Sequence, residues 1–580
     1  MIRKLASCIR DNKLHTILTP LFMLGEVGLE CTLPMITAKL INAIEAGAEM
    51  SLILRYGAIL IVMAMGSMCC GILSGWFAAS ASAGFARNLR HDLFARVQSF
   101  SFANIDKFST SSLVTRLTTD VTNVQNAFMM IIRIAVRSPL MLVFAVLMSI
   151  NMGGHVSLVF LLVVPILGFG LIFIAKKAMP LFKAVFKKYD KLNNSIQENV
   201  KGMRVVKSFV REDYEQLKFG KASEDVRNDF TKAEKLLAFN NPLMLFAMYV
   251  CMILIPLLSA KTIIASGGSK MQVGDLASLI TYAMQILMSL MMLSMIFVIL
   301  TISAEAARRV TEVLDTEPTL KNPEHPVTEV KDGSVDFDGV SFKYNPDARA
   351  YALADVDLHI KSGQTVGILG GTGSAKTTLI QLISRLYDAT EGSVKVGGVD
   401  VRDYDMEALR NQVAVVLQKN VLFSGTIKEN LRWGDPDASD EELVRVCKQA
   451  QAHDFIVAHP EGYDRFIEQG GANVSGGQKQ RLCIARALLK KPKILILDDS
   501  TSAVDTQTDA LIRRAFREEL PNVTKLIIAQ RVASVQDADL ILIMDGGRIV
   551  AQGTHAELLE SSEIYREVYT SQTKGGEDVA

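Results

Sequence analysis

The segment Gly370-Gly-Thr-Gly-Ser-Ala-Lys-Thr377 places an α/β fold in the carboxy-terminal part of the chain. It follows the apolar run Thr365–Leu369, which has the length of a buried strand, and it opens a segment with helical spacing. A glycine-rich turn between a strand and a helix presents backbone N–H groups to phosphate. The pattern predicts a phosphate loop in which Lys376 reaches the β and γ phosphates and Thr377 ligates Mg²⁺.

One residue of this loop departs from the G-x-x-x-x-G-K-[ST] pattern. Ala375 stands where the pattern has the glycine before the lysine. A Cβ at that position strains a backbone conformation that glycine adopts freely. We therefore expect the loop to bind phosphate more weakly but still to bind it.

Further motifs follow in the same part of the chain. The apolar run Ile494–Leu497 ends in Asp498, which is placed to hold Mg²⁺ through water. The sequence Val474-Ser-Gly-Gly-Gln478 precedes a helix, and its Ser475, Gly476 and Gly477 would present N–H groups to the γ-phosphate of a second nucleotide. Gln418, the segment Ser502-Ala-Val-Asp505 and a strand–loop at 527–531 complete the set.

The part of the chain before residue 315 has a different composition. It contains six apolar stretches that each approach the roughly 20 residues needed to cross a bilayer as a helix, at about 16–38, 52–78, 128–150, 156–178, 242–264 and 276–302. Over the whole chain 49% of the 580 residues are apolar, and the net charge of +1 gives no case for a nucleic-acid partner. The seven cysteines form no CxxC pair, which disfavours a zinc module.

The connections after the second and fourth stretches are long and basic. Residues 79–127 and 179–241 keep helical spacing, so they predict two hairpins with tips near Asn104–Ser109 and Phe209–Tyr214. By the positive-inside rule these connections and both termini are cytosolic. The expected fold is a multi-domain membrane protein: a six-helix transmembrane domain with long cytosolic helical extensions (1–315), a proline-containing linker (316–329), and an α/β P-loop ATPase domain with a helical signature subdomain (330–580).

The ordered motifs resemble the nucleotide-binding domain of ABC transporters, and over about residues 10–570 the chain resembles a half-transporter of the ABC exporter family. The resemblance implies two such chains, with ATP and Mg²⁺ held between one chain's phosphate loop and the other's signature sequence. It implies that Tyr344 stacks on adenine, although an ordinary aromatic at a strand end is the alternative, and that Gln418 couples Mg²⁺ to the membrane helices. The implied ATP contacts are Tyr344, Gly370, Gly371, Thr372, Gly373, Ser374, Ala375, Lys376, Thr377, Thr378 and Gln418; the implied Mg²⁺ contacts are Thr377, Gln418 and Asp498; the implied contacts to the partner's nucleotide are Val474, Ser475, Gly476, Gly477, Gln478 and Asp505.

The chain departs from the family pattern at positions that serve catalysis. Asp499 replaces a catalytic glutamate, Gln530 replaces a switch histidine, and Gln469 replaces a glutamate before the signature. Glutamine donates a hydrogen bond but cannot become a cation. Together with Ala375, these departures resemble the degenerate-site subunit of bacterial heterodimeric multidrug exporters. We expect an asymmetric heterodimer in which the VSGGQ sequence completes a competent site on the partner.

Other functions remain open at this point. A homodimeric exporter with two slow sites, a lipid flippase or an importer on the same scaffold would each fit the motifs. An ATP-binding regulatory or channel-like subunit is a rival from another class, but in such a protein the VSGGQ sequence would serve no purpose. The absence of an organelle-targeting segment and the family resemblance favour a bacterial plasma membrane.

The candidates for the substrate cavity come from charges inside apolar stretches. Glu26 and Glu30 share a helix face and would attract cationic, amphipathic small molecules, unless they bond polar neighbours or lie near lipid headgroups. Arg133 and Arg137 repeat the spacing and would pair with acids or line the opening. Met288 and Met295 belong to a methionine stripe suited to varied apolar shapes, although such a stripe also serves helix packing.

Overall fold

The computed structural model describes residues 1–499 and 504–574. They form two compact units, one of Met1–Ser99 with Phe108–Glu317, and one of Phe100–Lys107 with the chain from Pro318 onward. Ser502 and Ala503 of the segment singled out in the sequence lie outside the described residues.

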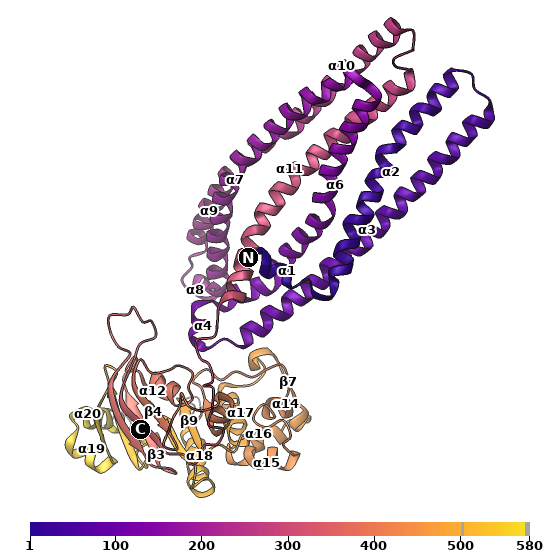
Figure 1. Ribbon diagram of the computed structural model, residues 1–580. Helices are drawn as coiled ribbons and strands as arrows, with labels where there is room; N and C mark the ends of the chain where they lie inside the picture. The colour runs from indigo at the N-terminus through magenta and orange to yellow at the C-terminus, as the bar shows by residue number, and fades with distance from the viewer. Residues whose placement is uncertain (500–503, 575–580) are drawn as a thin grey trace. The chain divides into compact units, whose positions relative to one another are not determined.

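The first unit is a set of long helices that run alongside one another (Figure 1). Five of the six apolar stretches lie within one helix each, and the stretch at about 156–178 begins in the 3-10 turn before its helix. The helices continue past the apolar residues. They are α2 (Lys13–Glu45), α3 (Met50–Gln98), α6 (Val121–Gly153), α7 (Leu158–Lys201), α10 (Asn240–Ser266) and α11 (Val273–Asp315).

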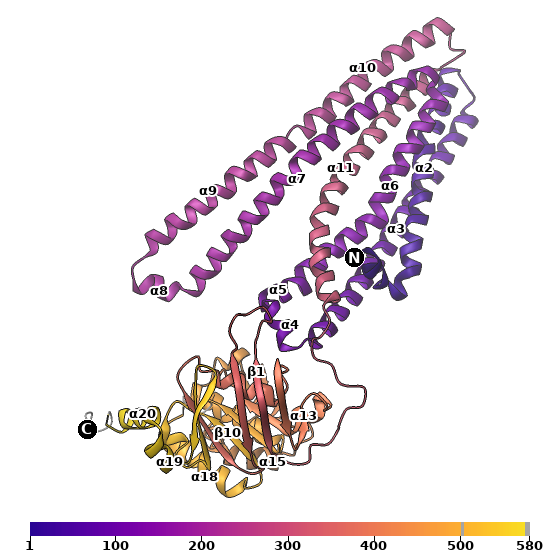
Figure 2. The ribbon, with the colours of Figure 1, turned by 60° about the vertical axis from the view of Figure 1, so that its left-hand side comes forward.

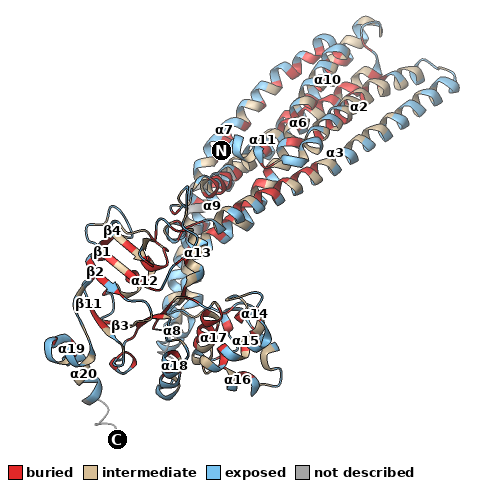
Figure 3. Ribbon diagram, turned by 60° about the horizontal axis from the view of Figure 1, so that its bottom comes forward, coloured by how far each residue is buried: buried red, intermediate tan, exposed pale blue. Residues whose placement is uncertain are grey.

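Five helical runs in the described chain are long and apolar enough to cross a membrane, judged by length and composition. The run Thr110–Phe182 includes α6 and the first part of α7, which are joined by a 3-10 turn at Gly154–Ser157, so it covers two of the predicted stretches. In the most apolar window of α3 only 6% of the residues are buried, and pale exposed positions follow this helix in Figure 3. Exposed apolar side chains such as Trp76 and Ile61 suit a lipid-facing surface.

Two helical hairpins extend the bundle, as the sequence predicted. The first turns through α4 (Phe102–Lys107) and α5 (Thr110–Thr115) and re-enters α6 through a π-helical turn at Arg116–Asp120. The second turns through α8 (Met203–Ser208) into α9 (Glu212–Leu237), which packs along α7 (Figure 2).

The first hairpin tip belongs to the second unit, so the boundary is not a single cut near residue 315. Tyr387 donates its hydroxyl hydrogen bond to Asp106 on α4 at 2.6 Å, and Ala103 packs against the core of this unit. The predicted linker 316–329 also packs there: the Val327 N–H donates to the Asp403 carbonyl at 2.8 Å. Prolines hold this strap extended, which lets its backbone pair with the domain surface.

The second unit contains a six-stranded and a four-stranded sheet. In the six-stranded sheet every neighbouring pair is parallel except β11–β12, and the order is β12 (Arg548–Gly553), β11 (Leu540–Asp545), β3 (Thr365–Gly370), β10 (Thr524–Ile528), β9 (Ile494–Asp498), β6 (Val413–Val416). The antiparallel sheet is β2 (Leu353–Ile360), β1 (Val335–Phe342), β4 (Glu391–Val396), β5 (Val399–Asp400). Strands β3, β9 and β10 are buried nearly throughout, as parallel strands covered on both faces are.

Helices complete this unit. α12 (Lys376–Ile383) follows β3, and α18 (Thr506–Glu519) precedes β10. A helical subdomain between β6 and β9 consists of α14 (Ile427–Leu431), α15 (Asp440–Gln449), α16 (His453–Val457) and α17 (Gly476–Leu489). The structure therefore has the predicted order, a unit of long apolar helices followed by an α/β unit with a helical subdomain.

Candidate functional site

A cleft of about 620 Å³ lies at the carboxyl ends of β3, β9 and β10. This edge of a parallel sheet is where open α/β folds bind ligands. The cleft brings together most of the predicted ATP and Mg²⁺ contacts: Tyr344, Gly370, Gly371, Thr372, Gly373, Ala375, Lys376, Thr377, Thr378, Gln418 and Asp498, with Asp499 and Gln530 beside them.

The phosphate loop wraps the amino end of α12. Lys376 curls back over the loop, and its Nζ donates to the carbonyls of Gly370 at 2.8 Å and Gly371 at 2.7 Å. Burial lowers the pKa of Lys376, while the charges of Asp498 and Asp499 oppose that shift. A partly dehydrated ammonium above a helix N-terminus fits the phosphates of a nucleotide.

Ala375 takes the conformation that glycine would favour. Its φ of +70° lies in the left-handed region, where a Cβ costs about 1 kcal/mol. The neighbouring Gly373 has φ +85°, which is free of that cost. The predicted strain at Ala375 therefore has a geometric basis.

Two oxygen groups beside the loop suit Mg²⁺. Thr377 donates its hydroxyl hydrogen bond to the Asp498 carboxylate at 2.9 Å. Asp498 is 3% exposed, and burial raises its pKa, with the Asp499 charge adding and the Thr377 hydrogen bond opposing. Hard oxygen donors of this kind, together with substrate phosphates, hold Mg²⁺ in nucleotide-hydrolysing sites.

The two catalytic departures contact each other. Gln530 donates from Nε2 to Oδ2 of Asp499 at 2.8 Å. Asp499 is 9% exposed and has φ +49°, so a strained turn at the end of β9 holds its carboxylate in place. This arrangement gives the Asp499 carboxylate a neutral amide partner at the edge of the cleft.

Tyr344 stands at the cleft wall, half-exposed. Its hydroxyl lies 2.9 Å from the Thr378 hydroxyl and donates to Gln381 at 3.2 Å, and its ring meets Tyr387 edge-on with centroids 5.2 Å apart. Burial of the hydroxyl end raises the pKa of Tyr344. The ring is held upright by these contacts and leaves an aromatic face for a ligand.

The signature residues are not part of this cleft. Ser475 caps α17: its hydroxyl accepts from the Gln478 N–H at 3.3 Å, and its own N–H donates to the Gln478 side chain at 3.2 Å. Gly476 and Gly477 form the first turn, Val474 is buried below, and Gln469 lies in the preceding 3-10 turn. Asp505 caps α18 through Thr508.

Sequence reasoning missed several residues of the cleft wall. Tyr351 and Ala352 precede β2, and Gly546 and Gly547 form the turn between β11 and β12. Two consecutive glycines are typical of a turn, so the sequence did indicate a turn at Gly546 and Gly547. Its position at the cleft depended on β11 pairing with β3, which no local pattern reveals.

The charged candidates of the membrane unit form a cluster. Arg137 donates to Glu30 at 2.6 Å and lies 3.5 Å from Glu26. Glu30, Arg133, Arg137 and Met288 line a cavity of about 500 Å³, whereas Glu26 and Met295 are not among its lining residues. Glu26 and Glu30 therefore have a cationic partner within the protein and are less available to a cationic ligand than the sequence suggested.

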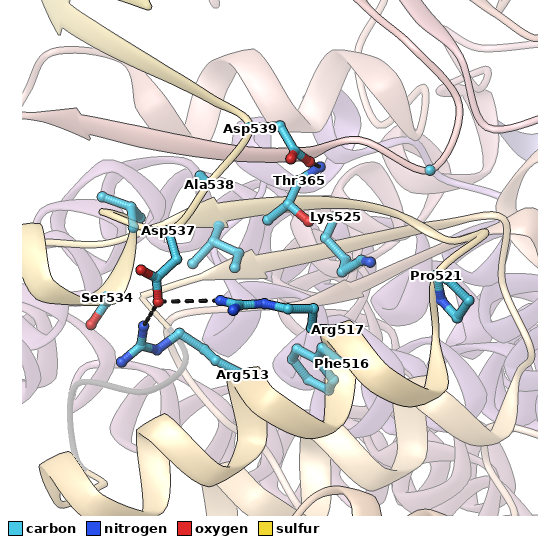
Figure 4. Close-up of a pocket in the computed structure, with 13 residues that line it drawn as sticks. Thr365, Arg513, Phe516, Arg517, Pro521, Lys525, Ser534, Asp537, Ala538 and Asp539 are labelled. Carbon is cyan, nitrogen blue, oxygen red and sulfur yellow. Dashed lines mark hydrogen bonds and ion pairs between the residues drawn. The ribbon is translucent and has the colours of Figure 1, made fainter. Parts of the chain in front are cut away.

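A different pocket, of about 260 Å³, lies at the opposite ends of β3 and β10 (Figure 4). Asp537 pairs with Arg513 at 3.4 Å and Arg517 at 3.2 Å. Lys525 donates to the Leu520 carbonyl at 2.8 Å, and burial lowers its pKa. The charges of Arg513 and Arg517 are thus balanced by Asp537 within the protein.

Comparisons with known proteins agree with this architecture. Residues 16–290 match the ABC transporter transmembrane region and residues 353–502 match the ABC transporter domain. The chain is 37% identical over 98% of both chains to an uncharacterized ABC transporter ATP-binding protein, YfiB, of Bacillus subtilis. It is 33% identical, over 82% of this chain and 75% of the relative, to a fatty acid ABC transporter ATP-binding/permease protein of Mycobacterium bovis.

A solved structure extends the likeness to three dimensions. A bacterial Atm1-family ABC exporter with ATP bound aligns with a TM-score of 0.84 and 25% identity, over 97% of this chain and 99% of that one. The motifs, the sheet order and these matches lead to one conclusion. The chain belongs to the ABC transporter family, as an exporter-type half-transporter whose helical membrane domain is fused to an ATP-binding domain.

Proposed function

We propose that this chain is one half of an ATP-driven exporter of amphipathic small molecules in a bacterial plasma membrane, with its nucleotide-binding domain in the cytoplasm. Its own site binds ATP and hydrolyses it slowly, and its signature sequence completes the catalytic site of a different half-transporter. The observation that carries this proposal is the 2.8 Å hydrogen bond between Gln530 and Asp499. It joins the two positions where the family has its catalytic glutamate and switch histidine.

Compared with the family pattern, this chain keeps the residues that bind nucleotide and differs at the residues that activate water. The proposal is supported by Lys376, Thr377 and Asp498, which line the cleft and offer it an ammonium, a hydroxyl and a carboxylate. When bound, Mg²⁺ supplies positive charge to the phosphates. The Asp499 side chain is one methylene shorter than a glutamate side chain, and its carboxylate accepts a hydrogen bond from the Gln530 amide. It is therefore poorly placed to accept a proton from water.

Dimer formation follows from surfaces that one chain leaves open. Ser475 and Gly476 are exposed at the amino end of α17, where a nucleotide on a second chain would meet them. The second hairpin tip exposes Phe209 (73%) and Val210 (81%). A groove of about 310 Å³ on the ATP-binding domain has the stacked rings of Phe423 and Trp433 on its wall. Exposed apolar surfaces of this kind mark contact sites.

The test is the rate of ATP hydrolysis by this chain purified alone and co-purified with a half-transporter encoded beside it that carries an intact glutamate and histidine. We expect near-inactivity alone and turnover on the order of 1 s⁻¹ or more for the pair. Ser475→Arg in this chain should abolish the turnover of the pair. Ser439→Arg is the matched control, because Ser439 caps α15 with the same capping box, outside the signature.

Each outcome separates the proposed function from its rivals. Brisk hydrolysis by the chain alone would favour a homodimeric exporter. Turnover by the pair that survives Ser475→Arg would remove the role proposed for the signature. ATP binding without turnover in either preparation would favour a regulatory or channel-like subunit.

A further inference from the structure

A cavity in the membrane unit has the composition of a small-molecule site. It occupies about 500 Å³ between α2, α6 and α11. A few polar groups stand on a largely apolar wall, which is the usual character of ligand pockets. The lining residues that matter here are Arg133 and Arg137 from α6 and Met284, Gln285, Met288 and Met292 from α11.

The charges on this wall are unevenly paired. Arg137 is engaged by both glutamates of α2, at 2.6 Å from Glu30 and 3.5 Å from Glu26. Arg133 lies one helical turn earlier on α6 and is half-buried. No ion pair reaches it from any residue in the ranges 1–499 and 504–574. A guanidinium removed from water without a counter-charge is unfavourable, and an incoming anion would relieve that cost.

Two buried polar atoms next to the cavity have no hydrogen-bond partner. The Gln285 side-chain carbonyl is one of them, although the same amide donates weakly to the Glu30 carbonyl at 3.4 Å. The other is Oε2 of Glu26, which does not line the cavity and whose side chain is 11% exposed. Both atoms are acceptors, so each would take a hydrogen bond from water or another donor, and neither would contact an anionic headgroup.

A cationic headgroup fits this wall poorly. It would have to approach Glu30, whose carboxylate already accepts from Arg137, and it would be repelled by both guanidinium groups. An anionic headgroup would meet Arg133 directly, with Arg137 one turn away. The methionines of α11 recur at intervals of four along one face, and flexible thioether side chains adapt to apolar bodies of varied shape.

We propose that this cavity binds amphipathic anions, with the acidic headgroup on Arg133 and the apolar body against Met284, Met288 and Met292. The proposal rests on the proposed export function and names the class of molecule exported. It replaces the cationic substrates suggested by the glutamates alone. Arg133 is then the residue that selects for negative charge.

The experiment is photolabelling of the full chain in phosphatidylcholine nanodiscs with a long-chain fatty acid that carries a diazirine. Oleate, oleylamine and oleyl alcohol compete at equal chain length, and labelled peptides are mapped. We expect saturable labelling on α6 and α11 that oleate displaces best. Arg133→Gln should weaken oleate competition about tenfold or more, as loss of a hydrogen bond to a charged group does.

Two control variants test whether the positive charge at position 133 is what binds oleate. Arg133→Lys keeps the charge and should retain most of the affinity, whereas Lys261→Gln removes an exposed cation on α10 that does not line the cavity and should change nothing. Equal competition by oleylamine, wild-type affinity in Arg133→Gln, or labelling that neither saturates nor maps to these helices would each overturn the proposal.

The labelling needs no ATP, so it separates this proposal from the proposed function. ATP hydrolysis by the co-purified pair is measured in parallel. Turnover without selective oleate binding would contradict only the anion site. Selective, Arg133-dependent binding without turnover in any preparation would contradict the exporter and leave the cavity as an anion site.

Discussion

The Asp499–Gln530 pair gives the sharpest test of slow hydrolysis. An aspartate is one methylene shorter than glutamate, a loss of about 1.5 Å of reach. Misplacement of a catalytic group by about 1 Å costs roughly a hundredfold in rate. We therefore expect Asp499→Glu combined with Gln530→His to raise hydrolysis by this chain alone about a hundredfold.

The single changes should do much less, and the structure gives the reason. In Asp499→Glu the longer carboxylate would enter the space of the Gln530 amide, which already stands 2.8 Å from the aspartate. In Gln530→His the carboxylate stays short. Such non-additivity is expected of two residues in direct contact.

The assay is phosphate release at saturating Mg²⁺-ATP from the chain in lipid nanodiscs, with nucleotide occupancy checked by a fluorescent ATP analogue. Asp499→Asn is the isosteric control and should change the slow rate little. Two results would refute the reasoning: a double variant that binds ATP fully yet stays slow, or an Asp499→Asn variant that loses all hydrolysis. The second would mean that Asp499 already acts as the base.

Three further predictions follow from the structure. Ala375→Gly removes the strain of about 1 kcal/mol from the left-handed backbone and should tighten ATP binding about fivefold in an equilibrium titration. Unchanged affinity would mean that the loop carries the same strain with and without nucleotide. Mg²⁺ binds the ionised carboxylate of Asp498, and burial raises the pKa of that group. The Mg²⁺-dependent affinity for ATP should therefore fall as the pH drops, and the fall should begin above the usual aspartate pKa of about 3.9. Asp498→Asn should abolish this pH dependence. Asp120→Asn breaks the bidentate ion pair with Arg309 and should lower the free energy of unfolding by about 2 kcal/mol, measured as a lowered thermal midpoint. Arg308→Gln breaks an exposed ion pair and should lower the midpoint little. Equal losses in the two variants would show that burial does not strengthen the Asp120 pair.

Local pattern was sufficient for the elements of the fold. The apolar stretches that became α2 and α10 were readable because a bilayer-length run of apolar residues has few other stable forms. The loop at Gly370 and the strand ending in Asp498 were readable because phosphate binding demands particular residues at fixed spacing. These are short-range constraints, and a sequence displays them directly.

The sequence allowed Arg137 to pair with an acid but could not identify which acid. Arg137 and the pair Glu26 and Glu30 are more than a hundred residues apart, and only the packing of α2 on α6 brings them into contact. The same packing engages Arg137 with the glutamates, whereas no described residue forms an ion pair with Arg133, and this difference underlies the anion site proposed above. Helical periodicity assigned each residue to a face of its own helix but gave no information on the facing helix.

The sequence by itself determined the family, the order of the two domains and the residue types at each nucleotide position, because catalytic motifs constrain side chains at fixed local spacing. Only the tertiary structure decided that Gln530 bonds Asp499 across β9 and β10, and that α4 belongs with the ATP-binding unit. The physical reason is that hydrogen bonds and ion pairs depend on distances between atoms, and folding sets those distances through packing that no single segment contains.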